Sequence, residues 1–289
     1  MKDLESYSLY LGKLAVQSLI EEAELTPKPG LVDKKSSGSH RDMSLSTLIR
    51  SAIALEDTFR KIAETSFNRT PSQELREEIA MIGRRGEQEM FLATGGVNTH
   101  KGAIWALGLL VSSAAMDLGE SPGKEVAVQA GKIALYEDRN LLPDKTNGSR
   151  VKARYGVGGA RGEAEQGFPH IRQIALPALA ESRERGLKED FCRLNVLIGL
   201  MAELNDTCIL HRGGAEALEI TKAYAKEIVM AGGISADKGW QLLEQLDQLL
   251  CSMNVSPGGS ADLLAAAIFL DYLDQNSKRE SKRLEALQI

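Results

Sequence analysis

Histidine, cysteine and aromatic residues are scarce in this chain of 289 residues, which has four histidines, three cysteines and 5% aromatic residues. The cysteines lie far apart and form no C-x-x-C pair, so we expect free buried thiols rather than disulfides or a zinc site. Few aromatic rings and a net charge of −5 argue against a nucleic-acid partner, which needs stacking rings and a basic surface.

Long apolar runs are also missing. The longest covers residues 103–116, includes serine and glycine, and is too short to cross a bilayer. Residues 1–5 are acidic and have none of the apolar character of a secretion signal. We therefore expect a cytoplasmic protein without a membrane partner.

The common nucleotide-binding and hydrolase motifs are absent as well. The sequence contains no G-x-x-x-x-G-K-[ST] loop, no G-x-S-x-G elbow and no H-E-x-x-H pair. Residues 156–159 fall short of G-x-G-x-x-G, and no strand is expected before them. A nucleotide would therefore have to bind to an unusual, helical scaffold.

Hydrophobic residues recur at helical spacing along most of the chain, as at Leu48, Ile49 and Ala52. No stretch alternates with the period of a strand. The sequence predicts an all-α fold with roughly nine to twelve helices, given the typical helix length, in a single domain over residues 1–289. Residues 144–158 form the longest non-periodic segment, which we expect to be an active-site loop or a domain boundary.

Each histidine lies in a short polar segment that contains glycine, and a fifth segment has the same composition without a histidine. Taken alone, each segment has a structural explanation as a turn, an N-cap or a C-cap. Their joint occurrence in helical sequence favours loops that converge on one polar site. The segments are 26–43, 94–102, 159–170, 205–214 and 254–262.

Glycines precede three of the expected helices, which begin near residues 102, 215 and 260. Helix N-termini present free N–H groups and the positive end of the helix dipole, so each is a candidate phosphate site. Lys101, Arg161 and Arg212 add charge-assisted donors nearby. The pattern indicates binding of a polyphosphate.

Carboxylates occur in the same segments, and together with phosphate oxygens they commonly hold Mg²⁺. One carboxylate or histidine could instead act as a general base. Glu163 also has a structural explanation, as a surface partner of Arg161 or Arg172. The candidate metal ligands are Asp33, Asp42, Asp206 and Asp262.

These segments resemble the triphosphoribosyl-dephospho-coenzyme A synthases over residues 8–273. The blocks that carry the resemblance are TPKPGLVD at 26–33, GSHRDM at 38–43, GVNTHKG at 96–102, GARGEA at 159–164, HRGG at 211–214 and SPGGSADLL at 256–264. One small departure is Ser39, where members of the family usually have alanine.

The resemblance implies an all-α pentosyltransferase that uses ATP and 3′-dephospho-CoA as substrates. It would transfer the 5-triphosphoribosyl unit of ATP to the 2′-hydroxyl of dephospho-CoA and release adenine. The product would be the precursor of the prosthetic group of citrate lyase or malonate decarboxylase. A separate transferase would then attach it to an acyl carrier protein. The sequence leaves open which of the two systems is served, and also the oligomeric state, a homo-oligomer included.

The implied chemistry needs a base for the acceptor hydroxyl and an acid for the departing adenine. We expect Glu163 as base and His100 as acid, with the reverse assignment, or His40 in either role, as alternatives. The expected phosphate-binding residues are Lys28, Asn98, Lys101, Arg161, His211, Arg212, Gly258, Gly259 and Ser260. Two rival functions are a metal-dependent nucleotide hydrolase and a non-catalytic module that binds the cofactor precursor.

Overall fold

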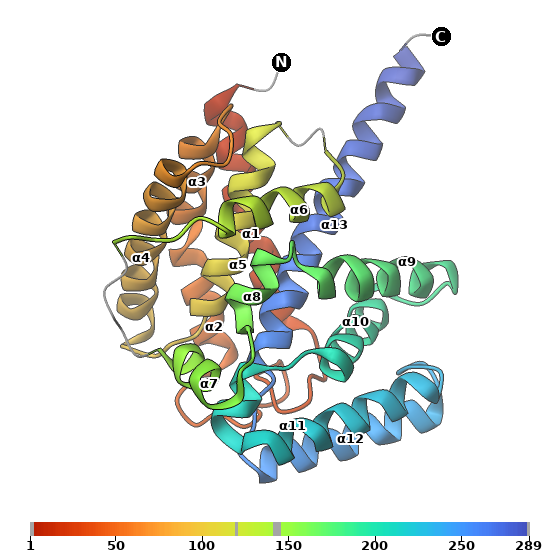
Figure 1. The fold of residues 1–289 in the computed structure, drawn as a ribbon. Coiled ribbons are helices and arrows are strands. Elements are labelled where there is room, and N and C mark those ends of the chain that lie inside the picture. The colour runs from red at the N-terminus through yellow and green to blue at the C-terminus, as the bar shows by residue number, and fades with distance from the viewer. Residues whose placement is uncertain (1–2, 119–120, 141–145, 288–289) are drawn as a thin grey trace.

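The computed structural model describes residues 3–118, 121–140 and 146–287 (Figure 1). Every regular element in these ranges is helical, which confirms the all-α prediction. The elements are α1 (Leu4–Glu24), α2 (Leu45–Ala54), α3 (Glu56–Ser66), α4 (Gln73–Thr94), α5 (Lys101–Met116), α6 (Gly123–Ala134), α7 (Asn147–Tyr155), α8 (Gly159–Glu165), a π-helical turn (Ile171–Ala175), α9 (Leu176–Glu184), α10 (Glu189–Glu203), α11 (Thr207–Met230), α12 (Asp237–Ser252) and α13 (Gly258–Leu287).

Polar side chains fix where several helices begin. Each accepts a hydrogen bond from a backbone N–H in the first turn, which otherwise has no partner within the helix. These N-cap residues are Asp3 for α1, Ser44 for α2, Ser72 for α4, Thr146 for α7 and Asp206 for α11.

Two apolar helices form the centre of the core. Helix α5 buries residues on all sides and contacts α1, α3, α4, α6, α8 and α13, as expected for a helix that is hydrophobic all round. The first half of α13 is equally buried and contacts helices from both ends of the chain. Figure 1 shows α13 running through the molecule towards the C-terminus. No helix within the described residues is long and apolar enough to span a membrane.

The segment expected to be an irregular loop contains a helix. Helix α7 occupies Asn147–Tyr155, begins after the Thr146 cap and ends at Gly156, whose φ of 71° is a conformation that favours glycine. Only Val151 of α7 is buried, so this helix needs no apolar stripe, and its sequence has none. Residues 141–145 of the same segment lie outside the described residues.

Candidate active site

The first turns of α11 and α13 are joined by one buried carboxylate. Oδ2 of Asp206 accepts hydrogen bonds from the backbone N–H of Ser260 at 2.8 Å and from its hydroxyl at 3.0 Å. Oδ1 accepts from the backbone N–H of Cys208 at 2.8 Å. Burial raises the pKa of Asp206. These groups hold two helices together here, so the metal and phosphate roles expected of Asp206 and Ser260 stay predictions.

The first turn of α5 also meets a carboxylate from α13. A Cβ atom placed on Gly102 would lie 2.0 Å from Oδ2 of Asp262, so any larger residue at this position would have to displace the carboxylate. Burial, together with the negative charges of Glu22 and Asp206, raises the pKa of Asp262 well above its usual value. The starts of α5, α11 and α13 therefore converge on a buried acidic region.

Lys28 places a positive charge beside this region. The residue is 2% exposed, and its Nζ lies 2.5 Å from Oε1 and 2.6 Å from the carbonyl oxygen of Glu22. Its backbone N–H donates to Oδ2 of Asp33 at 3.0 Å. No sequence pattern singles out Glu22, because it lies inside the amphipathic helix α1, where glutamate is usually a surface residue.

His100 precedes α5 and is almost completely buried. Its Nδ1 lies 2.7 Å from the Ser51 hydroxyl, which lies 2.6 Å from the hydroxyl of Thr99. Nε2 is buried and has no hydrogen-bond partner among the described residues. Burial, followed by the positive charge of Lys28, lowers the pKa of His100 to about 4. The imidazole is therefore neutral at pH 7 and has one nitrogen free for a ligand.

His40 connects three of the predicted segments. Its Nε2 lies 3.0 Å from the Ser256 hydroxyl, and its Nδ1 lies 3.2 Å from Nη2 of Arg212. Because Arg212 can only donate, Nδ1 accepts and Nε2 carries the proton. Burial and the charge of Arg212 lower the pKa of His40. The carboxylate of Asp42, 3.5 Å from Nδ1, is 61% exposed and lies at the edge of this cluster.

Glu163 is buried and paired with a histidine. Its Oε2 lies 2.6 Å from Nδ1 of His170, and its Oε1 accepts the backbone N–H of His170 at 2.9 Å. The carboxylate raises the pKa of His170. The structural alternative, a surface pair with Arg161 or Arg172, is wrong, because Arg161 pairs with Glu165 and Arg172 donates to backbone carbonyls. The sequence placed His170 in a polar segment but gave it no role.

Helix α8 and the loop before it are fixed against α5 and α11. A Cβ atom on Gly159 would lie 3.1 Å from Cγ2 of Thr207, the first residue of α11. The indole N–H of Trp105 on α5 donates to the carbonyl oxygen of Ala160 at 3.2 Å. Segment 159–170 thus adjoins segment 205–214 at Thr207 and the body of α5 at Trp105.

The remaining expected phosphate ligands lie at the surface or have partners. Lys101 pairs with Glu87 at 2.8 Å, and Arg161 pairs with Glu165 at 2.6 Å. Asn98 and His211 are exposed. Gly213 does not begin a separate element, but Gly214 has φ 75° and ψ −168° and kinks α11, so a new helical segment starts there.

The four expected metal ligands do not form one cluster. Both oxygens of Asp33 accept backbone N–H groups, from Lys28 and from Lys35 and Ser36. Within the described ranges, no group of three or more histidine, cysteine, aspartate or glutamate residues is arranged to hold a metal ion. Asp262 has no side-chain partner within the described ranges. It is therefore the best placed of the four to bind a cation whose other ligands come from a bound substrate.

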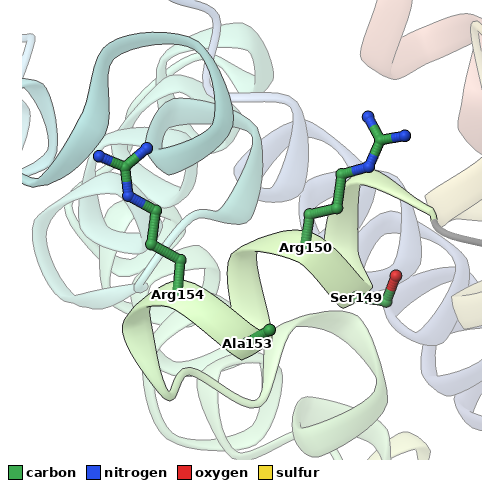
Figure 2. Close-up of a pocket in the computed structure, with 4 residues that line it drawn as sticks. All are labelled: Ser149, Arg150, Ala153 and Arg154. Atoms are coloured by element: carbon green, nitrogen blue, oxygen red, sulfur yellow. The ribbon is translucent and has the colours of Figure 1, made fainter.

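A cavity beside α7 was missed by the sequence analysis. It has a volume of about 550 Å³ and is lined by Ser149, Arg150, Ala153 and Arg154. Figure 2 shows the guanidinium groups of Arg150 and Arg154 standing apart on the same side of α7. The absence of an apolar stripe concealed the helix, and with it the spacing of these two arginines.

Comparison with known proteins gives consistent matches. The model of the ATP:dephospho-CoA triphosphoribosyl transferase family matches residues 8–281. A Klebsiella pneumoniae protein named 2-(5''-triphosphoribosyl)-3'-dephosphocoenzyme-A synthase is 46% identical over 267 residues, which cover 92% of this chain and 95% of that protein. A protein from Pseudomonas syringae pv. syringae (strain B728a), named as a probable enzyme of this kind, is 47% identical over 266 residues, 91% of each chain.

No solved structure matches the chain. The family model nevertheless includes all five polar segments, and both relatives match over nine-tenths of their length. The chain therefore belongs to the ATP:dephospho-CoA triphosphoribosyl transferase family.

Proposed function

We propose that this protein transfers the 5-triphosphoribosyl unit of ATP to the 2′-hydroxyl of 3′-dephospho-CoA and releases adenine. The observation that carries the proposal is the family match over residues 8–281, supported by relatives at 46% and 47% identity that carry the synthase name. Neither rival function, the nucleotide hydrolase or the non-catalytic module, has a comparable observation in its favour.

The reaction forms a bond between the acceptor oxygen and C1 of the ATP ribose, while the bond from C1 to adenine breaks. Positive charge develops at C1, as at other glycosidic carbons. A base takes the hydroxyl proton, an acid protonates or hydrogen-bonds adenine, and the triphosphate stays on the ribose. Kinase-type loops are not needed, because no phosphoryl group moves.

Glu163 and His170 are proposed to act together as the base. The carboxylate fixes the ring of His170 and raises its pKa, which makes the imidazole a better proton acceptor. The side chain of His170 is 26% exposed and that of Glu163 is 6% exposed, so a proton reaches the pair more easily through the ring.

His100 is proposed to contact the leaving adenine or the ribose through its unpartnered Nε2. With a pKa of about 4 it is neutral, so it would donate a hydrogen bond rather than a full proton unless a ligand changes its charge environment. An arriving triphosphate would oppose the effect of Lys28 and favour the protonated ring. His40 and Arg212, which are hydrogen-bonded to each other, would contact the phosphates or the ribose.

Magnesium is proposed to enter with the triphosphate. Mg²⁺ keeps several waters and is commonly held by one or two carboxylates plus substrate phosphates. Asp262 fits this requirement, because its half-buried carboxylate lies beside the charges of Glu22 and Asp206 and gains from a nearby cation. Bound there, the ion would neutralise phosphate charge.

Localisation in the cytoplasm and transfer of the product to an acyl carrier protein also stay proposals.

The test is incubation of the purified protein with Mg²⁺, dephospho-CoA and ATP labelled on the γ-phosphate. We expect adenine in equal amount to a coenzyme product that retains the label, both identified by mass spectrometry. Adenine without a coenzyme product would indicate the hydrolase, and binding without turnover would indicate the non-catalytic module. Release of the label as phosphate or pyrophosphate would contradict the proposed transfer.

A further inference from the structure

Helix α7 is strongly basic and largely exposed. It carries Arg150, Lys152 and Arg154, has no acidic residue, and buries only Val151. Among the described residues, none of these three cations forms an ion pair; Arg154 only packs over the ring of Tyr155, at 5.1 Å from its centroid. The cations expected from the sequence to bind phosphate, Lys101 and Arg161, are by contrast already paired with glutamates.

The arrangement of these cations does not stabilise the helix. Arg150 and Arg154 are four residues apart, where like charges repel and destabilise an isolated helix. Burial of the single side chain of Val151 gives little compensation. An anion bound between the two guanidinium groups would remove the repulsion and supply charge-assisted hydrogen bonds.

The cavity beside α7 is an open hollow at the protein surface, since all four residues that line it are exposed, and it has room for such an anion. Arg150 and Arg154 line it together with Ser149 and Ala153, and its volume is about 550 Å³ (Figure 2). Ser149 adds a hydroxyl donor to this lining. The lining side chains thus supply two guanidinium groups and one hydroxyl, all of which can donate hydrogen bonds to a phosphate.

Helix α7 adjoins the candidate active site. A Cβ atom on Gly214 would lie 3.5 Å from the hydroxyl of Tyr155, the last residue of α7. Gly214 follows two residues after Arg212, which bonds to His40. Residues 156–158 connect the end of α7 to Gly159. A Cβ atom on Gly159 would lie 3.1 Å from Cγ2 of Thr207, the first residue of α11.

We propose that the α7 cavity binds the phosphoanhydride chain of a nucleotide substrate between Arg150 and Arg154. The inference rests on the proposed function for the identity of the nucleotides. Two substrates carry this chemistry: ATP has a triphosphate, and dephospho-CoA has a diphosphate. An acidic partner protein would be a different occupant, and binding measurements with the nucleotides distinguish the two.

The test compares the double variant Arg150→Ala/Arg154→Ala with wild type. Binding of ATP, dephospho-CoA and inorganic tripolyphosphate is measured by calorimetry, and KM and kcat are measured for each substrate. The control is Lys124→Ala/Lys132→Ala, which removes the same charge from exposed positions on α6. A third variant, Arg150→Lys/Arg154→Lys, keeps the charge, and thermal melts confirm that all variants fold.

We expect Kd and KM to rise roughly 10–100-fold for the substrate whose phosphates bind there, the loss of one or two charge-assisted hydrogen bonds, with kcat within about threefold. The lysine variant should recover part of the loss. A change confined to ATP assigns the triphosphate, and a change confined to dephospho-CoA assigns the diphosphate. Unchanged binding of both substrates, relative to the α6 control, would overturn the inference and leave an acidic protein as the occupant to test.

The two proposals fail in distinguishable ways. If wild type makes no coenzyme product but the α7 variant loses nucleotide binding, the proposed function is wrong and the cavity still binds phosphate. If wild type makes the product and the α7 variant binds and turns over normally, the cavity assignment is wrong and the function stands.

Discussion

Both oxygens of the Glu163 carboxylate are bound to one residue, His170: Oε2 lies 2.6 Å from Nδ1, and Oε1 accepts the backbone N–H at 2.9 Å. The pair is formed across a turn of only seven residues, in which Gly167 and Phe168 both adopt positive φ. This turn fixes the ring of His170 relative to α8. It brings together Glu163 and His170, whose pairing could not be predicted from the sequence.

The Glu163–His170 pair should make the free energy of unfolding depend on pH. Because the pKa of His170 is raised in the folded protein, its stabilising effect is fully present below the unfolded pKa, about 6.5, and is lost as pH rises through the folded pKa. We expect Glu163→Gln to lower the free energy of unfolding by about 1.5–3 kcal/mol at pH 6, and by less at pH 9. Denaturant melts at both pH values measure this. An equal loss at both would show that the pair is not ionic.

The same pair should govern turnover. A general base contributes on the order of 10²–10⁴-fold to the rate. We therefore expect Glu163→Gln and His170→Asn each to lower kcat by a factor in this range, while both substrates still bind. Because the residues act as a unit, the double variant should be scarcely slower than either single variant. Single-turnover kinetics with direct binding measurements test this. If turnover of both single variants stays within threefold of wild type, the pair has only a structural role.

The helical fold could be predicted from the sequence because its signal is local. Apolar composition and spacing depend on residues within one or two turns, and they were sufficient for α5, which has no side-chain cap, and for the first half of α13. Helix α7 was missed for the same reason, since it buries only Val151 and therefore has no apolar stripe. Its start depends on the Thr146 cap, and its end on Gly156.

The pairings inside the site could not be predicted, because they join residues far apart in sequence. Composition placed Asp206 and Ser260 in polar segments, but nothing local shows that one carboxylate binds the first turn of the other helix. The unpartnered Nε2 of His100 and the buried pair of Lys28 with Glu22 likewise result from packing. Residue types in short motifs therefore indicated a candidate site, and only the fold shows which of its groups already have hydrogen-bond or ion-pair partners.

The close approach of α5 and α13 should make Gly102 intolerant of a side chain. A Cβ atom there would lie 2.0 Å from Oδ2 of Asp262, so Gly102→Ala must displace this carboxylate or the helix. We expect a loss of about 1–3 kcal/mol, typical of overpacking, and a marked loss of activity. The matched control is Gly83→Ala in α4, where the nearest atom is 3.8 Å away and helix propensity should give a gain of about 0.5–1 kcal/mol.

Chemical denaturation of the two glycine variants provides the measurement. Combining Gly102→Ala with Asp262→Ala removes the atom in conflict and should restore part of the stability, without restoring activity. A Gly102→Ala protein as stable and active as wild type would mean that the Asp262 carboxylate is not required at this position.

His100 should produce an acid-side loss of stability. Its pKa is about 4 in the folded protein, against about 6.5 when unfolded. The unfolded chain therefore binds more protons between these values, and stability must fall as pH decreases from 6.5 towards 4. The slope from this one group is at most about 1.4 kcal/mol per pH unit. Asp206, whose pKa is raised by burial, acts in the opposite sense, so the effect must be isolated by comparison with a variant.

His100→Gln provides this comparison, because the amide keeps a polar group near Ser51 and cannot titrate. We expect wild type to lose more stability than His100→Gln between pH 6.5 and pH 4.5, as measured by urea melts at half-unit intervals. ATP and Mg²⁺ should reduce the difference if the triphosphate favours the protonated ring, since bound anions raise the pKa of a nearby histidine. Parallel stability curves for the two proteins would show that the His100 ring is not held neutral by burial and Lys28, and the role proposed for its free Nε2 would have to be abandoned.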